Sequence, residues 1–192
     1  AGMKSVLLTT AAAVVVAAAV AASAISAPAP APSIAAVPER AANFQLTDTN
    51  RLAHELHYFK SAPAIVLMSQ VNGGKVSRET AAQLAKLQTA YKDQGVLFYM
   101  INSTQGQTRE ETAAEGKSQK FAVPVLMDEL QLVGEELGVK REGEVFVIEP
   151  KSGFKVAYHG PVTSAAKAID SVLAGKPVAT PRIEVKGGKE IA

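Results

Sequence analysis

The stretch of sequence that decides the fold reads Ala64-Ile65-Val66-Leu67-Met68-Ser69-Gln70-Val71-Asn72-Gly73-Gly74-Lys75-Val76-Ser77-Arg78. Its first part is an apolar run, typical of a strand buried on both faces of a sheet. A glycine turn follows, and we expect a helix from about Ser77 to Gln94. Unpaired backbone N–H groups and the helix dipole meet at such a turn, where they stabilise anions and thiolates. The turn is therefore the first candidate for a functional site.

The composition limits the functions that the chain can have. Lysine and arginine number 20 and aspartate and glutamate 18, giving a net charge of +2. This balance does not suggest the concentrated basic face of a nucleic-acid-binding protein, so no nucleic-acid partner is expected. The chain contains no cysteine, which excludes disulfides, thiolate metal sites and thiol catalysis. With 192 residues, 47% of them hydrophobic, it is long enough for one sizeable core.

The N-terminal residues 1–26 have two interpretations. An uncharged run follows Lys4, and its apolar part, Val6–Ile25, has about the 20 residues that a transmembrane helix needs. Alanine dominates the run, which weakens membrane insertion, and Ala22-Ser23-Ala24 resembles a signal-peptide cleavage site. A retained membrane anchor and a cleaved signal peptide both stay open. Both place the rest of the chain on the extracytoplasmic, periplasmic side, because Lys4 flanks the run on its N-terminal side.

Two polar or proline-rich segments bound the expected domain, residues 42–175. Residues 27–41 form an Ala/Pro-rich linker, in which Ala27-Pro28-Ala29-Pro30-Ala31-Pro32 predicts a stiff spacer. Residues 176–192 form a polar C-terminal tail that contains Gly187-Gly188-Lys189. The tail is either disordered or a segment that becomes ordered against a partner.

Hydrophobic periodicity predicts alternating strands and helices within this domain. Thr108, followed three residues later by Glu111, predicts a capping box at the start of one helix. An irregular or helical link is expected at 52–59 and a hairpin turn at 150–153. Strands are expected at 42–48, 64–69, 96–101, 123–128 (a short edge segment), 144–149 and 154–159, and helices at 77–94, 108–118, 130–137 and 163–174. This order gives an α/β fold with a mixed central sheet flanked by helices.

The pattern resembles the redoxin, peroxiredoxin-related branch of the thioredoxin-like superfamily, often found in bacterial envelopes. The resemblance covers about residues 42–173. It rests on the order of several segments: Asn43-Phe44-Gln45-Leu46-Thr47-Asp48, Ala64-Ile65-Val66-Leu67, Gly95-Val96, Asn102-Ser103, Pro124-Val125-Leu126-Met127-Asp128, Gly138-Val139, Glu144-Val145-Phe146-Val147-Ile148-Glu149-Pro150 and Tyr158-His159-Gly160. It implies a thioredoxin-like fold whose functional turn is the one between residues 69 and 77.

The chain departs from the family at the residues that carry the family's chemistry. The family's motif runs from a cysteine and a proline to an arginine, and here Gly74-Lys75-Val76-Ser77-Arg78 keeps only the arginine. The framing cis-proline of thioredoxins is replaced by Glu142-Gly143-Glu144, and Gly187-Gly188-Lys189 stands where some relatives have a late cysteine. We expect a degenerate turn with Gly73, Gly74, Lys75, Arg78 and Gly143 as possible binding residues. Peroxide reduction and disulfide exchange both need a sulfur nucleophile, so the chain is not expected to be an enzyme.

Other chemistry finds little support in the sequence. His54 and His57 lie three residues apart, but a metal site needs further ligands, and the third histidine, His159, is distant. Met68, Met100 and Met127 are expected in the core rather than in a copper site. Gly73-Gly74-Lys75 lacks the spacing of a phosphate-binding loop. No cofactor and no metal are expected.

The sequence leaves two hypotheses for the function. The first is a non-catalytic thioredoxin-like domain, tethered to the membrane, that serves as an accessory subunit of a larger envelope complex, for example a respiratory or photosynthetic one. The alternative is a secreted, periplasmic binding domain that presents the degenerate groove to a peptide or a small ligand. Retention of residues 3–25 in the mature chain separates the two.

Overall fold

The computed structural model describes residues 36–191 of the chain. The predicted transmembrane or signal segment, residues 1–26, and most of the linker lie outside the described residues. Within residues 36–191, no helix has both the length and the hydropathy that crossing a bilayer requires.

A seven-stranded mixed sheet forms the centre of the domain, with the strand order β2-β1-β5-β4-β3-β6-β7. Strand β3 is parallel to β4 and antiparallel to β6. The strands are β1 (Gln45–Asp48), β2 (Ala53–Glu55), β3 (Ile65–Ser69), β4 (Leu97–Asn102), β5 (Val125–Met127), β6 (Val145–Glu149) and β7 (Lys155–Gly160). The apolar run Ile65–Ser69 therefore lies in the interior of the sheet, with the predicted functional turn at the C-terminal end of β3.

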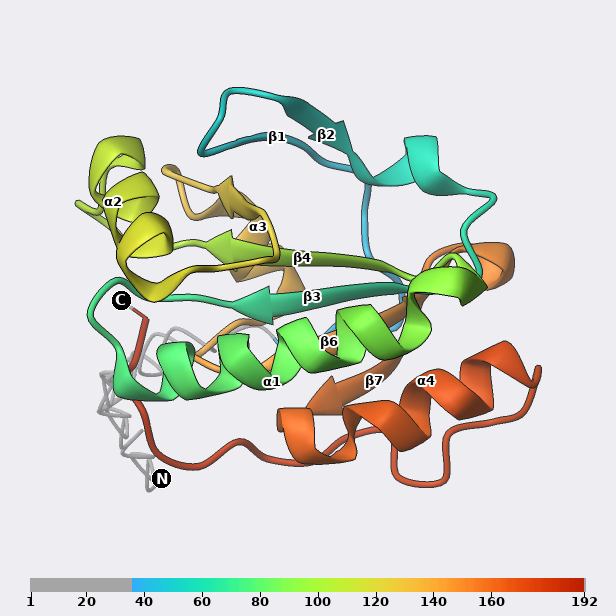
Figure 1. Ribbon diagram of the computed structural model, residues 1–192. Coiled ribbons are helices and arrows are strands. Elements are labelled where there is room, and N and C mark those ends of the chain that lie inside the picture. Colours follow the sequence, from blue (N-terminus) through green and yellow to red (C-terminus); the bar gives the residue numbers. More distant parts are fainter. Residues whose placement is uncertain (1–35, 192) are drawn as a thin grey trace, which may run out of the picture. The chain divides into compact units, whose positions relative to one another are not determined.

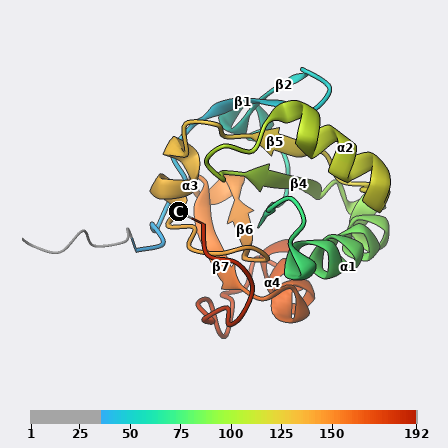
Figure 2. The same cartoon turned by 90° about the vertical axis from the view of Figure 1, so that its left-hand side faces the viewer.

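In the described part of the chain, four α-helices flank the sheet: α1 (Lys75–Tyr91), α2 (Arg109–Gln119), α3 (Leu132–Leu137) and α4 (Ala165–Leu173). Helices α1 and α4 lie beside each other against the sheet (Figure 1). Residues of α3 pack against the opposite face of the sheet, in a buried cluster that also contains Leu56 of the 3-10 turn Leu56–Phe59. Figure 2 shows α2 and the β1–β2 hairpin on the far side of the molecule from α4.

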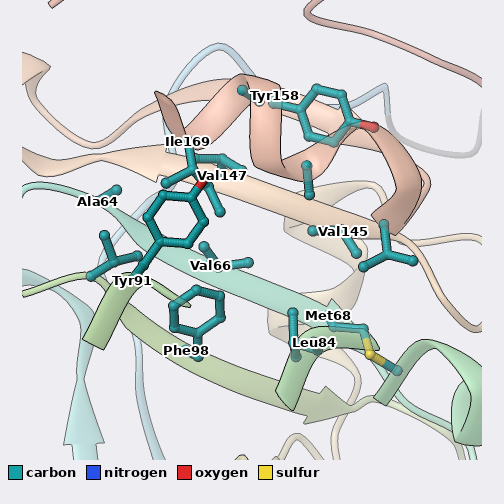
Figure 3. Close-up of a cluster of buried hydrophobic side chains, with 14 of the residues drawn as sticks. Ala64, Val66, Met68, Leu84, Tyr91, Phe98, Val145, Val147, Tyr158 and Ile169 are labelled. Atoms are coloured by element: carbon teal, nitrogen blue, oxygen red, sulfur yellow. The ribbon is translucent and has the colours of Figure 1, made fainter. Parts of the chain in front are cut away.

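The buried side chains of β3 alternate between the two faces of the sheet, because successive strand residues point to opposite sides. Val66 and Met68 belong to the cluster beneath α1 and α4, together with Leu84 and Tyr91 (Figure 3). Ile65 and Leu67 belong to the cluster on the other face. Burial of each such side chain contributes about 1.5–3 kcal/mol, so β3 stabilises both faces of the fold.

The structure confirms the thioredoxin-like α/β fold with a mixed sheet flanked by helices, and it corrects two details. The prediction of an edge segment at 123–128 is wrong, because β5 pairs with β4 on one side and with β1 on the other. Residues 52–59 are not wholly an irregular or helical link. Ala53–Glu55 form β2, which pairs with β1, and only then does a 3-10 turn follow.

The C-terminal residues lie against the domain itself, which is neither of the two alternatives drawn from the sequence. Beyond α4 the chain first pairs with β7, where the N–H of Ile183 donates to the carbonyl of His159 at 2.9 Å. It then forms an antiparallel bridge between Glu190 and Arg141, just before β6. Lys189 thereby comes close to the turn between β3 and α1, since its ammonium lies 3.9 Å from the place that a Cβ atom on Gly73 would take.

Candidate functional site

The turn between β3 and α1, residues 70–74, is closed by hydrogen bonds within the chain. The N–H of Gly74 donates to the carbonyl of Val71 at 3.1 Å, and the N–H of Val71 donates to Ser77 Oγ at 2.9 Å. Gly73 has a φ of +69°, a backbone conformation that glycine adopts without strain. Gly74 is the N-cap residue of α1 and has no side chain that could cap the helix.

A carboxylate from a distant part of the chain caps the helix instead. Glu142 precedes β6 and is only 2% exposed. Its Oε2 accepts the N–H of Ser77 in the first turn of α1 at 2.8 Å, and its Oε1 accepts the N–H of Lys189 at 2.7 Å. The positive end of the helix dipole, which would stabilise a thiolate in a redox enzyme, here stabilises the glutamate.

Glu142 also leaves no room for a side chain at position 74. A Cβ atom on Gly74 would lie 1.8 Å from Glu142 Oε2 and 2.8 Å from Glu142 Cδ. A Cβ atom on Gly73 would lie 3.9 Å from the Lys189 ammonium, on a backbone with positive φ. Glycine is therefore favoured at both positions of the turn. A side chain that carries a nucleophile could be placed at residue 74 only if Glu142 moved.

An ion pair joins the first turn of α1 to α2. Arg78 Nε donates to Glu115 Oε1 at 2.7 Å, and Arg78 Nη2 donates to Glu115 Oε2 at 2.9 Å. Glu115 Oε1 also accepts the N–H of Gly73 at 3.2 Å. The hydrogen bond from Arg78 is the main reason why the pKa of Glu115 is lowered, and it outweighs the effect of burial, while Gly73 and the charge of Lys189 add to it. Arg78 therefore holds α2 and the turn together.

A buried network of amides and hydroxyls lies beside this ion pair, at the C-terminal ends of β3 and β4. Asn102 Nδ2 donates to Gln70 Oε1 at 2.9 Å and to Gln107 Oε1 at 2.8 Å. Asn72 Nδ2 donates to Thr112 Oγ1 at 2.9 Å. These bonds link the two strand ends to α2 and fix the position of the turn.

The structure brings three of the five predicted site residues directly into the turn and its ion pair: Gly73, Gly74 and Arg78. Gly143 lies against the helix, since a Cβ atom there would be 2.7 Å from Val76 Cγ1. Lys75 points away from the turn: its side chain is 87% exposed, and its ammonium lies 3.9 Å from Glu79 Oε1. It therefore makes no contact that would assign it a binding role.

Glu115, Glu142 and Lys189 complete the site and were not among its predicted residues. Glu142 was visible only as a replacement for a proline. Nothing local in the sequence indicates that its side chain reaches a helix that begins 67 residues earlier at Lys75. A pair of glycines before a helix, with no Ser, Thr, Asp or Asn to cap it, is the one available hint that the cap comes from elsewhere.

His54, His57, Met68 and Met100 pack within the domain. His54 Nε2 lies 2.9 Å from Asp48 Oδ2, and the ring of His57 stacks on Phe154 at 4.0 Å. Met68 and Met100 are fully buried. Over residues 36–191, no group of three or more histidine, cysteine, aspartate or glutamate side chains is arranged to hold a metal ion.

A second surface feature lies away from the turn. An open groove of about 470 Å³ runs between β1 and α3, lined by residues that include Leu46, Met127 and Val133. Leu130 and Leu132 stand at this groove with 78% and 62% of their surfaces exposed. Large apolar side chains exposed together are typical of a surface that contacts another macromolecule.

Comparison with known proteins identifies the family. The pattern of the AhpC/TSA family matches residues 37–158, more than half of the chain. The chain belongs to the AhpC/TSA family. Among curated proteins, none matches it. As a member of this family without a cysteine, the chain lacks the residue on which the family's thiol redox chemistry depends.

Solved structures support the same fold. A hypothetical protein from Sinorhizobium meliloti 1021 is 27% identical, with a TM-score of 0.72 over 82% of this chain and 94% of the other. The peroxidoxin BcpB of Mycobacterium tuberculosis is 19% identical, with a TM-score of 0.60 over 72% and 96%. A putative thiol:disulfide interchange protein DsbE from Chlorobium tepidum is 16% identical, with a TM-score of 0.62 over 70% and 96%. At these identities the last two show the fold alone.

Proposed function

We propose that this chain is a non-catalytic AhpC/TSA-family domain that is tethered to the membrane by residues 1–26 and serves as an accessory subunit of a larger envelope complex. One observation carries the non-catalytic part: the Glu142 carboxylate occupies the start of α1, where the family's chemistry would need a thiolate. A side chain at residue 74 would collide with that carboxylate. The site therefore differs from a thiol site in two ways: it has no cysteine, and the Glu142 carboxylate accepts a hydrogen bond at the start of α1.

The tethering part rests on the sequence. The apolar run Val6–Ile25 and the proline-rich linker that follows it suit a domain held a short distance from a bilayer. The accessory role gains support from the exposed Leu130 and Leu132 beside the groove between β1 and α3. These side chains offer an apolar surface to a protein neighbour.

Extraction of native membranes with a mild detergent, followed by size-exclusion chromatography and mass spectrometry, tests the proposal. The expected result is a chain that retains residues 3–25 and elutes with the subunits of one defined membrane complex. Leu130→Ser combined with Leu132→Ser should release it from that complex, whereas Leu52→Ser, at another residue that is 61% exposed, should not.

Two results would overturn this account. A chain processed after Ala24 and found as a free monomer in the periplasmic fraction would contradict the tethered subunit and favour the secreted domain. Peroxidase or disulfide-reductase turnover by the purified chain would contradict the non-catalytic assignment. The secreted-domain hypothesis also needs access to the start of α1, where Gly188 and Lys189 lie against Glu142 in this structure.

A further inference from the structure

The C-terminal strap, residues 187–191, pairs through its backbone with residues 140–142, the segment that leads into β6. The N–H of Glu142 donates to the carbonyl of Lys189 at 3.0 Å, and the N–H of Ile191 donates to the carbonyl of Lys140 at 2.8 Å. Glu190 and Arg141 form the antiparallel bridge between these two bonds. Backbone pairing of this kind supplies affinity that does not depend on sequence.

Side chains of the domain add specificity to this pairing. Glu142 Oε1 accepts the N–H of Lys189 at 2.7 Å, and the charge of Lys189 lowers the pKa of Glu115 after the larger effects of Arg78 and Gly73. Arg141 Nη1 donates to the carbonyl of Gly187 at 3.1 Å, and Arg141 Nη2 donates to Glu190 Oε1 at 3.3 Å. The contact with Glu142 is made by a backbone N–H and does not depend on the side chain, whereas the charges of Glu115 and Arg141 favour a lysine followed by a glutamate.

The shape of the surface restricts which residues can occupy the two ends of the strap. A Cβ atom on Gly188 would lie 2.8 Å from Glu142 Cγ and 3.3 Å from Val76 Cγ2, so only glycine fits there. Ile191, at the other end, packs against the buried cluster on the α3 side of the sheet. The strap residues from 187 to 190 are otherwise exposed. A segment with so little buried apolar surface opens locally at a low cost in free energy.

We propose that residues 140–142, with the carboxylates of Glu115 and Glu142, form a binding site for an extended peptide that carries a glycine, a lysine, an acidic residue and an aliphatic residue in that order. The chain's own strap fills this site in cis. A tethered segment has an effective concentration in the millimolar range, so a partner peptide binds only when the strap is weakened or when it binds much more tightly. The inference rests on one part of the proposed function, the loss of thiol chemistry at this turn, and not on membrane tethering.

Two glycines of the strap provide a matched pair of variants in the full chain. Gly187 and Gly188 have φ angles of +79° and +78°, so an alanine at either position introduces similar backbone strain. A Cβ atom on Gly187 meets no atom within 4 Å, whereas one on Gly188 meets Glu142. In Gly188→Ala, hydrogen exchange at the amides of Glu142 and Ile191 should therefore be at least about tenfold faster than in Gly187→Ala.

Binding of the acetylated peptide of residues 185–192, VKGGKEIA, to these full-length variants tests the site directly. We expect Gly188→Ala to bind it at least about tenfold more tightly than the wild type and Gly187→Ala do, because its own strap competes less. A peptide in which the glycine at position 188 is replaced by valine should not bind. Isothermal titration calorimetry measures the affinities, and thermal unfolding confirms that each variant is folded.

Each outcome decides the question. If exchange shows that the strap of Gly188→Ala has been released but the peptide does not bind, the peptide site is refuted. If exchange at Ile191 is equal in the two variants, Gly188 does not seat the strap and the inference is also wrong. Membrane extraction and peroxidase assays test the proposed function without the peptide, so its failure can be told apart from a failure of the peptide site.

Discussion

Helices α1 and α2 both begin near the turn after β3, but the N–H groups of their first turns are satisfied from different distances along the chain. In α2 the cap is local: Thr108 Oγ1 accepts the N–H of Glu111 at 3.2 Å, and Glu111 Oε2 accepts the N–H of Thr108 at 2.9 Å. In α1 the cap residue is Gly74, and the acceptor is Glu142, 65 residues beyond Ser77. The local cap stabilises one helix, whereas the distant one joins a helix, the segment before β6 and the C-terminal strap.

The largest expected effect comes from removing the distant cap. Glu142→Ala leaves the N–H groups of Ser77 and Lys189 without their acceptors. Because an unsatisfied buried group costs about 1–3 kcal/mol, and the favourable charge at the helix start is also lost, we expect the free energy of unfolding to fall by about 3 kcal/mol. Chemical denaturation measures this change.

Glu111→Ala is the matched control for the local cap. It should cost only about 0.5–1 kcal/mol, because the N–H of Thr108 is exposed to water. Hydrogen exchange at Ile191 should become faster in Glu142→Ala and stay unchanged in Glu111→Ala. Equal costs for the two variants would mean that the distance of the cap makes no difference.

A second prediction concerns the fit between Gly74 and Glu142. Gly74 has a φ of −74°, which any residue can adopt, so Gly74→Ala acts through its Cβ alone. Displacing the carboxylate should destabilise the protein by about 2 kcal/mol. In a Glu142→Ala background the cost of the same change should fall towards zero, a coupling that a double-mutant cycle measures.

Gly116→Ala, within α2, is the control for this prediction. Its Cβ would meet only Phe121 Cδ2 at 3.5 Å, an ordinary contact. Because alanine favours the helix, the variant should be neutral or up to about 1 kcal/mol more stable. If Gly74→Ala costs the same with and without Glu142, the two residues do not act together.

A third prediction tests the opposite end of α1, where Tyr91 is held by α4. Its hydroxyl lies 2.6 Å from Asp170 Oδ1, and burial, followed by Asp170, raises its pKa from 10.0 to about 12. Between these two values the folded state keeps a proton that the unfolded state has lost. Stability therefore falls as the pH rises from about 10 to 12, and Tyr91 accounts for about 1.4 kcal/mol of this loss at pH 11.

Urea denaturation between pH 8 and pH 12 checks this slope. Tyr91→Phe should make the curve flatter over that range, whereas Tyr58→Phe, at a side chain that is 79% exposed, should leave it unchanged. An identical slope in the wild type and Tyr91→Phe would show that the contact between α1 and α4 does not depend on this proton.

The same contrast between local and distant signals explains which parts of the structure the sequence revealed. The run at residues 64–69 has a strand pattern of its own, and Thr108 with Glu111 forms a cap within four residues, so both predictions are confirmed. The position of β5 depends on pairing with β1, which lies more than 70 residues earlier. No periodicity in residues 123–128 carries that information, so the segment was wrongly expected at an edge.

The candidate site was less predictable than the fold for the same reason. Gly73, Gly74 and Arg78 lie within six residues of sequence, so they could be predicted together as parts of one turn. Their partners Glu115 and Glu142 come from α2 and from the segment before β6. Only the complete tertiary fold brings these carboxylates to the turn. A glutamate at either position resembles any surface glutamate until the fold is known.

The smallest expected effect comes from the local cap of α2. Thr108→Ala removes the acceptor of the Glu111 N–H and should cost about 1 kcal/mol, while Thr108→Ser, which keeps the hydroxyl, should cost less than half of that. Chemical denaturation measures both. Because both partners of the capping box, Thr108 and Glu111, belong to the start of α2, hydrogen exchange at the amides of Glu142 and Ile191 should be the same as in the wild type. Faster exchange there would show that the start of α2 also supports the strap, through Glu115 and Arg78, and that its cap is not local in its effect.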